Sequence, residues 1–567
     1  MPLLAGASLT LNNIPVRAMT ENSHFLRLAQ QSSNDRVLII LQLHGGNDGL
    51  NTIIPIDQYD LYYNRRANIA IPKQNSIRKL IEVDSTLPSA DQIGFHPDMQ
   101  AAKDLYDRGR MAVVQGVSYP RNNGSHFRGR DIQFMGGGPD DFYSSGWIGR
   151  YLQQQFDPLV YPDDFPNPDN PDPLAIEMGS DVSLIFHQEG NIPTSISIND
   201  PVGFANLVDN LEGFDDIDGV DPRGIPPQAL DSSPYGQELN WILGLEDKSQ
   251  DYASRLVEIY NQASAGTTTY PESYPFRAPR GSLRNPLSAQ LQIVSRLLDG
   301  GGAGQGVQTK VFLLRIGGFD THAGQVEADD PTMGGHAAKL YHISTAMQAF
   351  QNDLRARGIE DRVLTITTSE FGRRINSNGS FGTDHGTGAP MLIFGSGVQP
   401  GVLGTNQDLT NNSVRNVQMQ FDYRQVYANI LRDWMEVDEE VVNNDIFFGD
   451  FFNGPKDDGG FFEPLPLIAT EVTSTEGFFK DRFSLNDAYP NPAVDHTNIS
   501  FYINTGNNVN LKIMDQTGKT VRQVINERRE IGQHNVRVDL TGLKPGLYFY
   551  QIESGILKDS KKLMIIK

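Results

Sequence analysis

Carboxylate and imidazole side chains cluster beside apolar runs in residues 363–397 of this chain. Glu370 follows the first apolar run of that stretch, and Asp384 and His385 precede the second. Apolar runs of this length are typical of buried strands. Two strands that present an acid and an imidazole at their ends indicate an active site, because such groups bind metal ions and carry protons.

The same arrangement occurs after other apolar runs of the chain. Asp48 follows the run RVLIILQL and a glycine-rich turn, and Asp320 and His322 follow TKVFLLRI and two glycines. Ser125 and His126 lie in the loop after a further run, MAVVQGV. Groups at the carboxyl ends of parallel strands face the ligand crevice of an open α/β sheet. We therefore expect these side chains to meet in one site.

This mixture of side chains predicts a site for one or two divalent ions, such as zinc, manganese, magnesium or calcium. Thiolate ligands are excluded, since the chain has no cysteine. Such ions polarise a phosphoryl or sulfuryl oxygen and lower the pKa of a hydroxyl or water nucleophile. The predicted metal ligands are Asp48, Asp320, His322, Glu370, Asp384 and His385, and the predicted catalytic residues are Ser125, His126 and Glu370.

Several of these residues also have structural explanations. Ser125 stands where a helix would receive its N-cap, which is also where a serine nucleophile would stand. Glu370 would pair with Arg373 on a first helical turn. Asp384 would orient the imidazole of His385 instead of binding the ion itself. The sequence leaves both kinds of role open.

Strand and helix patterns alternate along the chain, which predicts an α/β fold with a mainly parallel sheet flanked by helices. His336 and His342 are expected to have structural roles, and so is His44, although its position before the glycines would also let it face the site. The principal strands are expected at 36–43, 111–117, 309–316, 363–367 and 390–394, and the principal helices at 237–263, 288–298, 336–357 and 422–437.

The length of 567 residues predicts one large domain and at least one small one. Beyond residue 483, short strands separated by turn residues predict a small β-sandwich. The net charge of -22 argues against a nucleic-acid partner, and no apolar run reaches membrane-spanning length. The expected boundaries are an export-signal remnant or disordered N-terminus at 1–33, the α/β domain at 34–452, a linker at 453–482 and the β-sandwich at 483–567.

A series of motifs resembles those of a large bacterial family of exported proteins of unknown function. They are HGGNDGLN at 44–51, SHF at 125–127, GGFDTH at 317–322, SEFGR at 369–373 and DHGTG at 384–388. That family is described as sulfatase-like and looks like a distant branch of the alkaline phosphatase superfamily. The resemblance implies an alkaline-phosphatase-like fold over roughly 34–437.

The resemblance also implies roles for particular residues. Asp48 is similar to the first metal ligand of the superfamily, and Ser125 stands at the position of its nucleophile. Asp320 with His322 is similar to the acid and histidine of the second metal, and His385 resembles the final histidine. Glu370, at the place of the acid in an acid-histidine pair, is followed by Phe371 instead of histidine. This departure implies that one metal site is lost, or rebuilt with His126, Asp384 or His44.

The C-terminal segment resembles the type A sorting domain of the type IX (Por) secretion system. The resemblance rests on FSLNDAYPNP at 483–492, IMDQTGK at 513–519 and LKPGLY at 543–548. It implies recognition by the type IX machinery at the outer membrane, removal of the tail, and release from or attachment to the cell surface.

Together these observations predict a secreted, metal-dependent hydrolase of phosphate or sulfate esters that acts on a small ester or glycan. The alternative is a non-catalytic cell-surface protein that keeps the fold with a degenerate metal site and binds glycans or another partner.

Overall fold

The chain divides into two compact units, Met1–Ile468 and Ala469–Lys567, in a computed structural model. The expectation for residues 1–33 lies outside the described residues, apart from the antiparallel pair β1 (Thr10–Leu11) and β2 (Ile14–Pro15). Of the expected linker, residues 470–482 also lie outside them. The structure describes residues 10–11, 14–15, 34–74, 76–209, 234–302, 304–457, 459–469, 483–485, 488, 491–503, 507–515, 519–529, 532–554 and 557–566.

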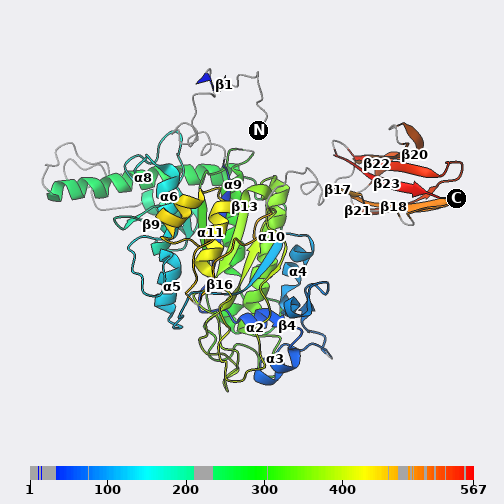
Figure 1. Cartoon of the computed structure of the whole chain (residues 1–567). Helices are drawn as coiled ribbons and strands as arrows, with labels where there is room; N and C mark the ends of the chain where they lie inside the picture. The colour runs from blue at the N-terminus through cyan, green and yellow to red at the C-terminus, as the bar shows by residue number, and fades with distance from the viewer. Residues whose placement is uncertain are drawn as a thin grey trace. The chain divides into compact units, whose positions relative to one another are not determined.

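A large sheet runs through the first unit (Figure 1). All of its neighbouring strands pair in parallel except β14, which is antiparallel to both β13 and β7. The prediction of an α/β fold with a mainly parallel sheet is therefore confirmed. In order across the sheet, the strands are β11 (Ser195–Ile198), β8 (Ala175–Met178), β12 (Val311–Ile316), β3 (Val37–Leu43), β13 (Val363–Thr368), β14 (Ala389–Phe394), β7 (Met111–Ser118) and β15 (Gly401–Leu403), with β16 (Phe421–Asp422) beside the end of β7.

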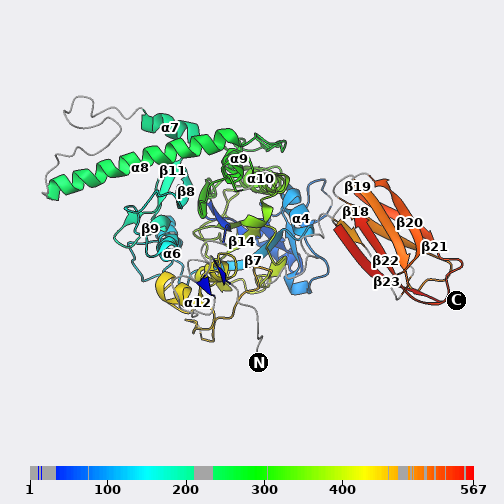
Figure 2. The same cartoon turned by 90° about the horizontal axis from the view of Figure 1, so that it is seen from above.

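Alternating side chains of the central strands enter two hydrophobic cores, one on each face of the sheet. On β3, Val37 and Ile39 join one core, and Leu38 and Ile40 join the other. Strands buried on both faces read as continuous apolar runs, which is why the sequence revealed them. Helices α4 (Gln100–Asp107), α9 (Pro286–Asp299) and α10 (Gly335–Arg357) cover the first face, and α5 (His126–Met135), α6 (Trp147–Phe156) and α11 (Tyr423–Asp433) cover the second (Figures 1 and 2).

Three parallel neighbours at the centre of the sheet, β12, β3 and β13, end at the same edge. The loops that follow them carry Asp48, Asp320 and Glu370. Next to this edge, a small antiparallel sheet of β4 (Ile53–Pro55), β6 (Ile93–Phe95) and β5 (Ile81–Glu82) accompanies the short helices α2 (Gly49–Thr52) and α3 (Tyr59–Arg65). The long helix α8 (Pro234–Gln262) also packs against α9.

The second unit contains two antiparallel sheets (Figure 2). Ile499 and Phe501 of one sheet share a hydrophobic core with Val509 and Leu511 of the other, so the two sheets pack face to face. In the described parts of both units, no helix is long and apolar enough to cross a membrane. One sheet holds β17 (Phe483–Leu485), β18 (His496–Ile503) and β21 (Gly532–Asp539), and the other holds β20 (Thr520–Arg529), β19 (Asn507–Met514), β22 (Gly546–Ser554) and β23 (Leu557–Ile565).

Candidate metal centre

The buried side chain of Arg373 connects the loops at the ends of the central strands through hydrogen bonds. Its guanidinium group donates hydrogen bonds to the carbonyl oxygens of Gly45, Phe319 and Thr383. It also donates to the carboxylate of Asp320 at 2.6 Å. The planar guanidinium offers several donors in a fixed geometry, so one side chain sets the positions of several loops.

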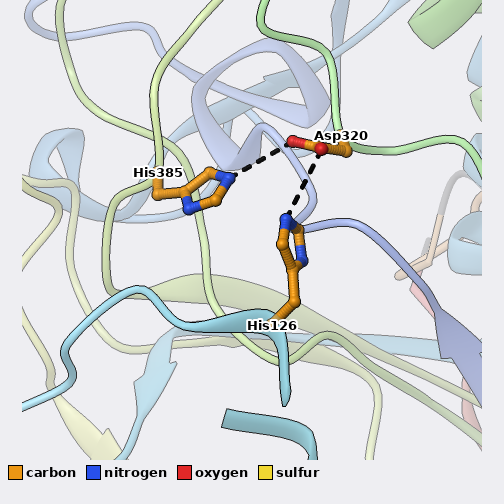
Figure 3. Close-up of side chains that lie close together, drawn as sticks. All are labelled: His126, Asp320 and His385. Carbon is orange, nitrogen blue, oxygen red and sulfur yellow. Dashed lines mark hydrogen bonds and ion pairs between the residues drawn. The ribbon is translucent and has the colours of Figure 1, made fainter. Parts of the chain in front are cut away.

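His126, Asp320 and His385 converge at the centre of these loops (Figure 3). One ligand atom from each lies within 4.8 Å of the other two. Asp320 Oδ1 is 3.3 Å from His385 Nε2, and Asp320 Oδ2 is 3.5 Å from His126 Nε2. His126 begins α5, whereas Asp320 and His385 come from the loops after β12 and before β14. The cluster therefore joins segments that are distant in sequence.

A hydrogen bond at Nδ1 orients each of the two imidazoles of the cluster. His126 Nδ1 donates to Glu370 Oε1 at 2.8 Å, and Glu370 also accepts a hydrogen bond from the backbone N–H of Gly45. His385 Nδ1 donates to the carbonyl oxygen of Gly124 at 2.8 Å. With the proton on Nδ1, both Nε2 atoms keep a lone pair directed at Asp320. Metal-binding histidines are commonly held in this way.

His322 supplies a further imidazole at the edge of the cluster. Its Nε2 lies 2.9 Å from His385 Nε2 and 3.3 Å from Asp320 Oδ1. Its Nδ1 lies 3.6 Å from Asp384 Oδ1, so Asp384 faces His322 and not His385, the imidazole that the sequence suggested.

The spacing of these atoms fits a small divalent ion. Ligands at roughly 2.0–2.1 Å from a tetrahedral ion are about 3.3 Å apart, and the separations around Asp320 are 3.3 and 3.5 Å. His126 Nε2 is buried and receives no hydrogen bond within the described part of the chain. A donor set of imidazole nitrogens with one carboxylate suits zinc or another first-row transition metal better than calcium or magnesium.

The charges of the cluster also suit metal binding. Partial burial raises the pKa of Asp320, but hydrogen bonds and charge from Arg373, together with His385, outweigh burial and lower this pKa to about 2. Burial lowers the pKa of His385. At neutral pH Asp320 is therefore ionised and His385 is neutral, which are the states in which they bind a metal.

Asp48 and Ser125, two of the predicted site residues, make structural contacts instead of joining the cluster. Both carboxylate oxygens of Asp48 are 3.0 Å from the guanidinium of Arg66, and one of them accepts a hydrogen bond from Gln325. Asp48 is buried in this ion pair, which attaches α3 to the central loops. Ser125 is the N-cap of α5, and its hydroxyl oxygen accepts a hydrogen bond from the backbone N–H of Arg128.

Glu370 and Asp384 lie around the cluster: Glu370 contacts His126, and Asp384 contacts His322 at the edge of the cluster. Glu370 does not pair with Arg373 on a helical turn, which was its structural explanation. The segment after β13 is extended, with bridges from Gly372 to Asn47 and from Arg373 to His385. From this extended segment, the side chain of Arg373 reaches the neighbouring loops.

The sequence favoured a structural role for His44, with a place in a rebuilt metal site as the alternative, and it marked Phe371 as a departure from the superfamily pattern. His44 Nδ1 lies 3.8 Å from Glu370 Oε1, and the His44 ring is 6.3 Å from that of His126. The ring of Phe371 packs 4.7 Å from His126 and 4.6 Å from His385, so it supports both imidazoles. The sequence signal that indicated Asp48, a position just after a buried apolar strand, also applies to His44.

Comparison with family models finds two matches within the chain. Residues 243–445 match a family described as a protein of unknown function (DUF1501). Residues 487–567 match the secretion system C-terminal sorting domain, which confirms export through the type IX system to the cell surface or the medium. The second unit therefore interacts with the type IX secretion machinery. Comparison with curated proteins finds no match.

Similar solved structures include PorZ, a surface component of the type IX secretion system of Porphyromonas gingivalis. It is 17% identical, with 18% of this chain and 14% of that chain covered and a TM-score of 0.11. A crystal structure of Ps i-CgsB in complex with k-i-k-neocarrahexaose is 10% identical, with 82% of each chain covered and a TM-score of 0.30. At such TM-scores neither similarity supports a statement about fold or function. The chain spans only 14% of the length of PorZ.

Proposed function

We propose that the first unit is a secreted hydrolase of phosphate or sulfate esters that depends on a divalent metal ion. The observation that carries this proposal is the convergence of His126, Asp320 and His385, whose ligand atoms lie within 4.8 Å of one another. His322 stands beside them as a further ligand. The alkaline-phosphatase-like affiliation suggested by the sequence motifs belongs to the same proposal.

The residues of the cluster would bind the ion, and their neighbours would orient them. A divalent ion bound there supplies Lewis-acid polarisation of the ester and lowers the pKa of water. Asp320 contributes the negative charge of the ligand set, and Arg373 fixes its orientation. Glu370 and the carbonyl of Gly124 hold the two imidazoles so that their Nε2 atoms face the ion.

Two arginines contribute positive charge near His44, which would favour an anionic substrate. Burial lowers the pKa of His44, the charge of Glu370 opposes this shift, and the positive charges of Arg315 and Arg130 lower the pKa further. The side chains of both arginines are about one-third exposed, at 31% for Arg315 and 33% for Arg130. Because Arg315 also pairs with Glu177 and Arg130 with Asp131, their charge is partly neutralised.

His44 is placed to exchange a proton with the substrate or with water. Its side chain is 43% exposed, although its Nδ1 is buried and lies 3.8 Å from Glu370 Oε1, so the exposed part of the ring is the part able to meet a substrate. Because burial lowers its pKa, the imidazole is neutral at pH 7 and is able to accept a proton. Ser125 adjoins the cluster through His126, and its hydroxyl proton remains available for donation.

Turnover of 4-nitrophenyl phosphate and 4-nitrophenyl sulfate tests this proposal. We expect the purified protein to hydrolyse at least one of them and to lose this activity with a chelator. Asp320→Ala and His385→Ala should abolish it, whereas His187→Ala, which removes a histidine outside the cluster, should retain it. Hydrolysis that survives both the chelator and the cluster substitutions would contradict a metal-dependent mechanism.

The second candidate is a non-catalytic surface protein that binds a ligand through the same ion. The specific observation for it is that Ser125 already serves as the N-cap of α5, while Phe371, which stands where the superfamily has a histidine, packs its apolar ring against His126 and His385. A protein that retains one ion per chain, binds a glycan through it and hydrolyses neither ester would favour this candidate.

A further inference from the structure

A groove on the surface of the first unit lies outside the candidate metal centre. Its volume is about 960 Å³, which is at the upper end of the range for small-molecule sites. The groove is lined by residues 56–61 and 63, by residues 72–74 and by Thr410. Helix α3 and the segment that follows it therefore form most of its wall.

A pair of tyrosines forms the aromatic part of this groove. Tyr59 and Tyr63 lie one turn apart on α3, with ring centroids 6.4 Å apart. The hydroxyl group of Tyr59 donates to the carbonyl oxygen of Ile71 and accepts from the backbone N–H of Lys73, so its ring is held in place. Tyr63 is 45% exposed, and its ring is available for contact with a ligand.

Exposed polar groups surround the tyrosines. Asp57, Asp60 and Gln74 are exposed in the lining, and the ammonium group of Lys73 lies 5.7 Å from the centroid of the Tyr59 ring. Carboxylates accept hydrogen bonds, while the ammonium and amide groups donate them. A sugar ring presents an apolar C–H face and a rim of hydroxyl groups that donate and accept. The tyrosine rings would stack on that apolar face, and the polar groups would form hydrogen bonds with the hydroxyl groups.

We propose that this groove binds a neutral oligosaccharide chain. The charge of the lining supports a neutral ligand, because two carboxylates and a single ammonium group would repel a polyanionic glycan. The oligosaccharide would bind at a surface separate from the metal cluster, so this inference does not depend on hydrolase activity. It gives the exported protein a means to attach to polysaccharide.

Hydrogen bonds attach the wall of the groove to a neighbouring loop, which would favour binding because less ordering is required. Arg65 donates to the side-chain oxygen of Asn376 at 3.0 Å, and Arg66 donates to the carbonyl oxygen of Arg374 at 3.0 Å. These contacts connect α3 to the loop that also carries His385. The groove therefore lies on the same end of the sheet as the metal cluster.

Calorimetric titration of the full chain with cellohexaose, maltohexaose and laminarihexaose, in the presence of a chelator, tests this proposal. We expect at least one neutral hexasaccharide to bind. Tyr63→Ala should weaken that binding about tenfold, through loss of the stacking surface. Asp60→Asn should weaken it through loss of a strong acceptor, and Phe461→Ala, which removes an exposed aromatic ring outside the groove, should leave it unchanged.

Three results would overturn the proposal. They are the absence of binding to any neutral hexasaccharide at millimolar concentration, binding that is unchanged in Tyr63→Ala, and binding only to a heparin hexasaccharide used as a polyanionic probe. Because Tyr63 and Asp60 are exposed, their substitution leaves the hydrophobic cores intact. Circular dichroism of each variant checks this, and the hydrolase assay is measured separately, so failure of one proposal is distinguishable from failure of the other.

Discussion

Asp48 and Asp320 follow neighbouring strands, yet their surroundings give them different roles. Asp48 is buried against Arg66, and although burial raises its pKa, the charges and hydrogen bonds around it lower the pKa overall. Asp320 has a side chain that is 47% exposed and faces the histidines. Position after a strand therefore does not by itself identify a metal ligand.

Substitution of Asp48 separates these two roles. Asp48→Asn leaves the buried charge of Arg66 without its partner, which should lower the free energy of unfolding by about 3 kcal/mol. The metal content should remain that of the unsubstituted protein. Urea denaturation measures the first effect and elemental analysis the second. Loss of the ion with unchanged stability would show instead that Asp48 is a ligand.

The structure brings together Asp320, His322, His385 and His126, which the sequence indicated because each lies beside a buried strand. The sequence could not indicate that Asp48 pairs with Arg66, since Arg66 directly follows α3 and no periodic pattern connects the two residues. The contacts of Arg373 were likewise hidden, because they reach loops that are distant in the sequence.

At the scale of elements, α10 carries a buried histidine that makes stability depend on pH. Burial lowers the pKa of His336 to about 4, while nearby Asp48 partly opposes this shift. The unfolded chain, with a histidine pKa near 6.5, binds the proton more readily than the folded one. The neutral imidazole therefore makes its full contribution to the free energy of unfolding above about pH 6.5. This contribution falls as the pH drops toward 4, by about 3 kcal/mol in total.

Replacement of His336 by glutamine tests this dependence. The amide of the variant is able to donate to Asn47 as His336 Nε2 does at 3.1 Å, but it does not titrate. The fall in the urea midpoint between pH 7 and pH 4.5 should be smaller in His336→Gln than in the unsubstituted protein. Equal falls in both proteins would show that this imidazole does not control acid stability.

Much of the element pattern was accessible from the sequence. The continuous apolar runs of β3, β7, β12 and β13 and the long pattern of α10 identified the centre of the sheet. The short strands β8 and β11 and the small sheet of β4, β5 and β6 have too few residues for a clear period. The antiparallel direction of β14 also has no local signal, because it is set by pairing with strands on both sides.

At the scale of the whole molecule, each unit has its own hydrophobic cores. The described cores of the first unit end at Ile468, and that of the second begins at Leu485. A chain cut after Ile468 should therefore keep the melting temperature and metal content of the first unit. In a bacterium with a type IX secretion system, it should remain in the periplasm, because the sorting domain is missing.

Cell fractionation followed by immunoblotting measures this effect. The full-length chain provides the comparison, and it should reach the cell surface or the medium. Surface delivery of the truncated chain would contradict the role of residues 487–567 as the sorting signal.

The proposed function depends on a metal ion held by His126, Asp320 and His385. Elemental analysis of the protein purified without chelators measures this ion. We expect about one zinc or other first-row divalent ion per chain, which is lost in His126→Ala and His385→Ala and retained in His187→Ala. A metal content near zero in the unsubstituted protein, or an equal content in all of these variants, would contradict the claim.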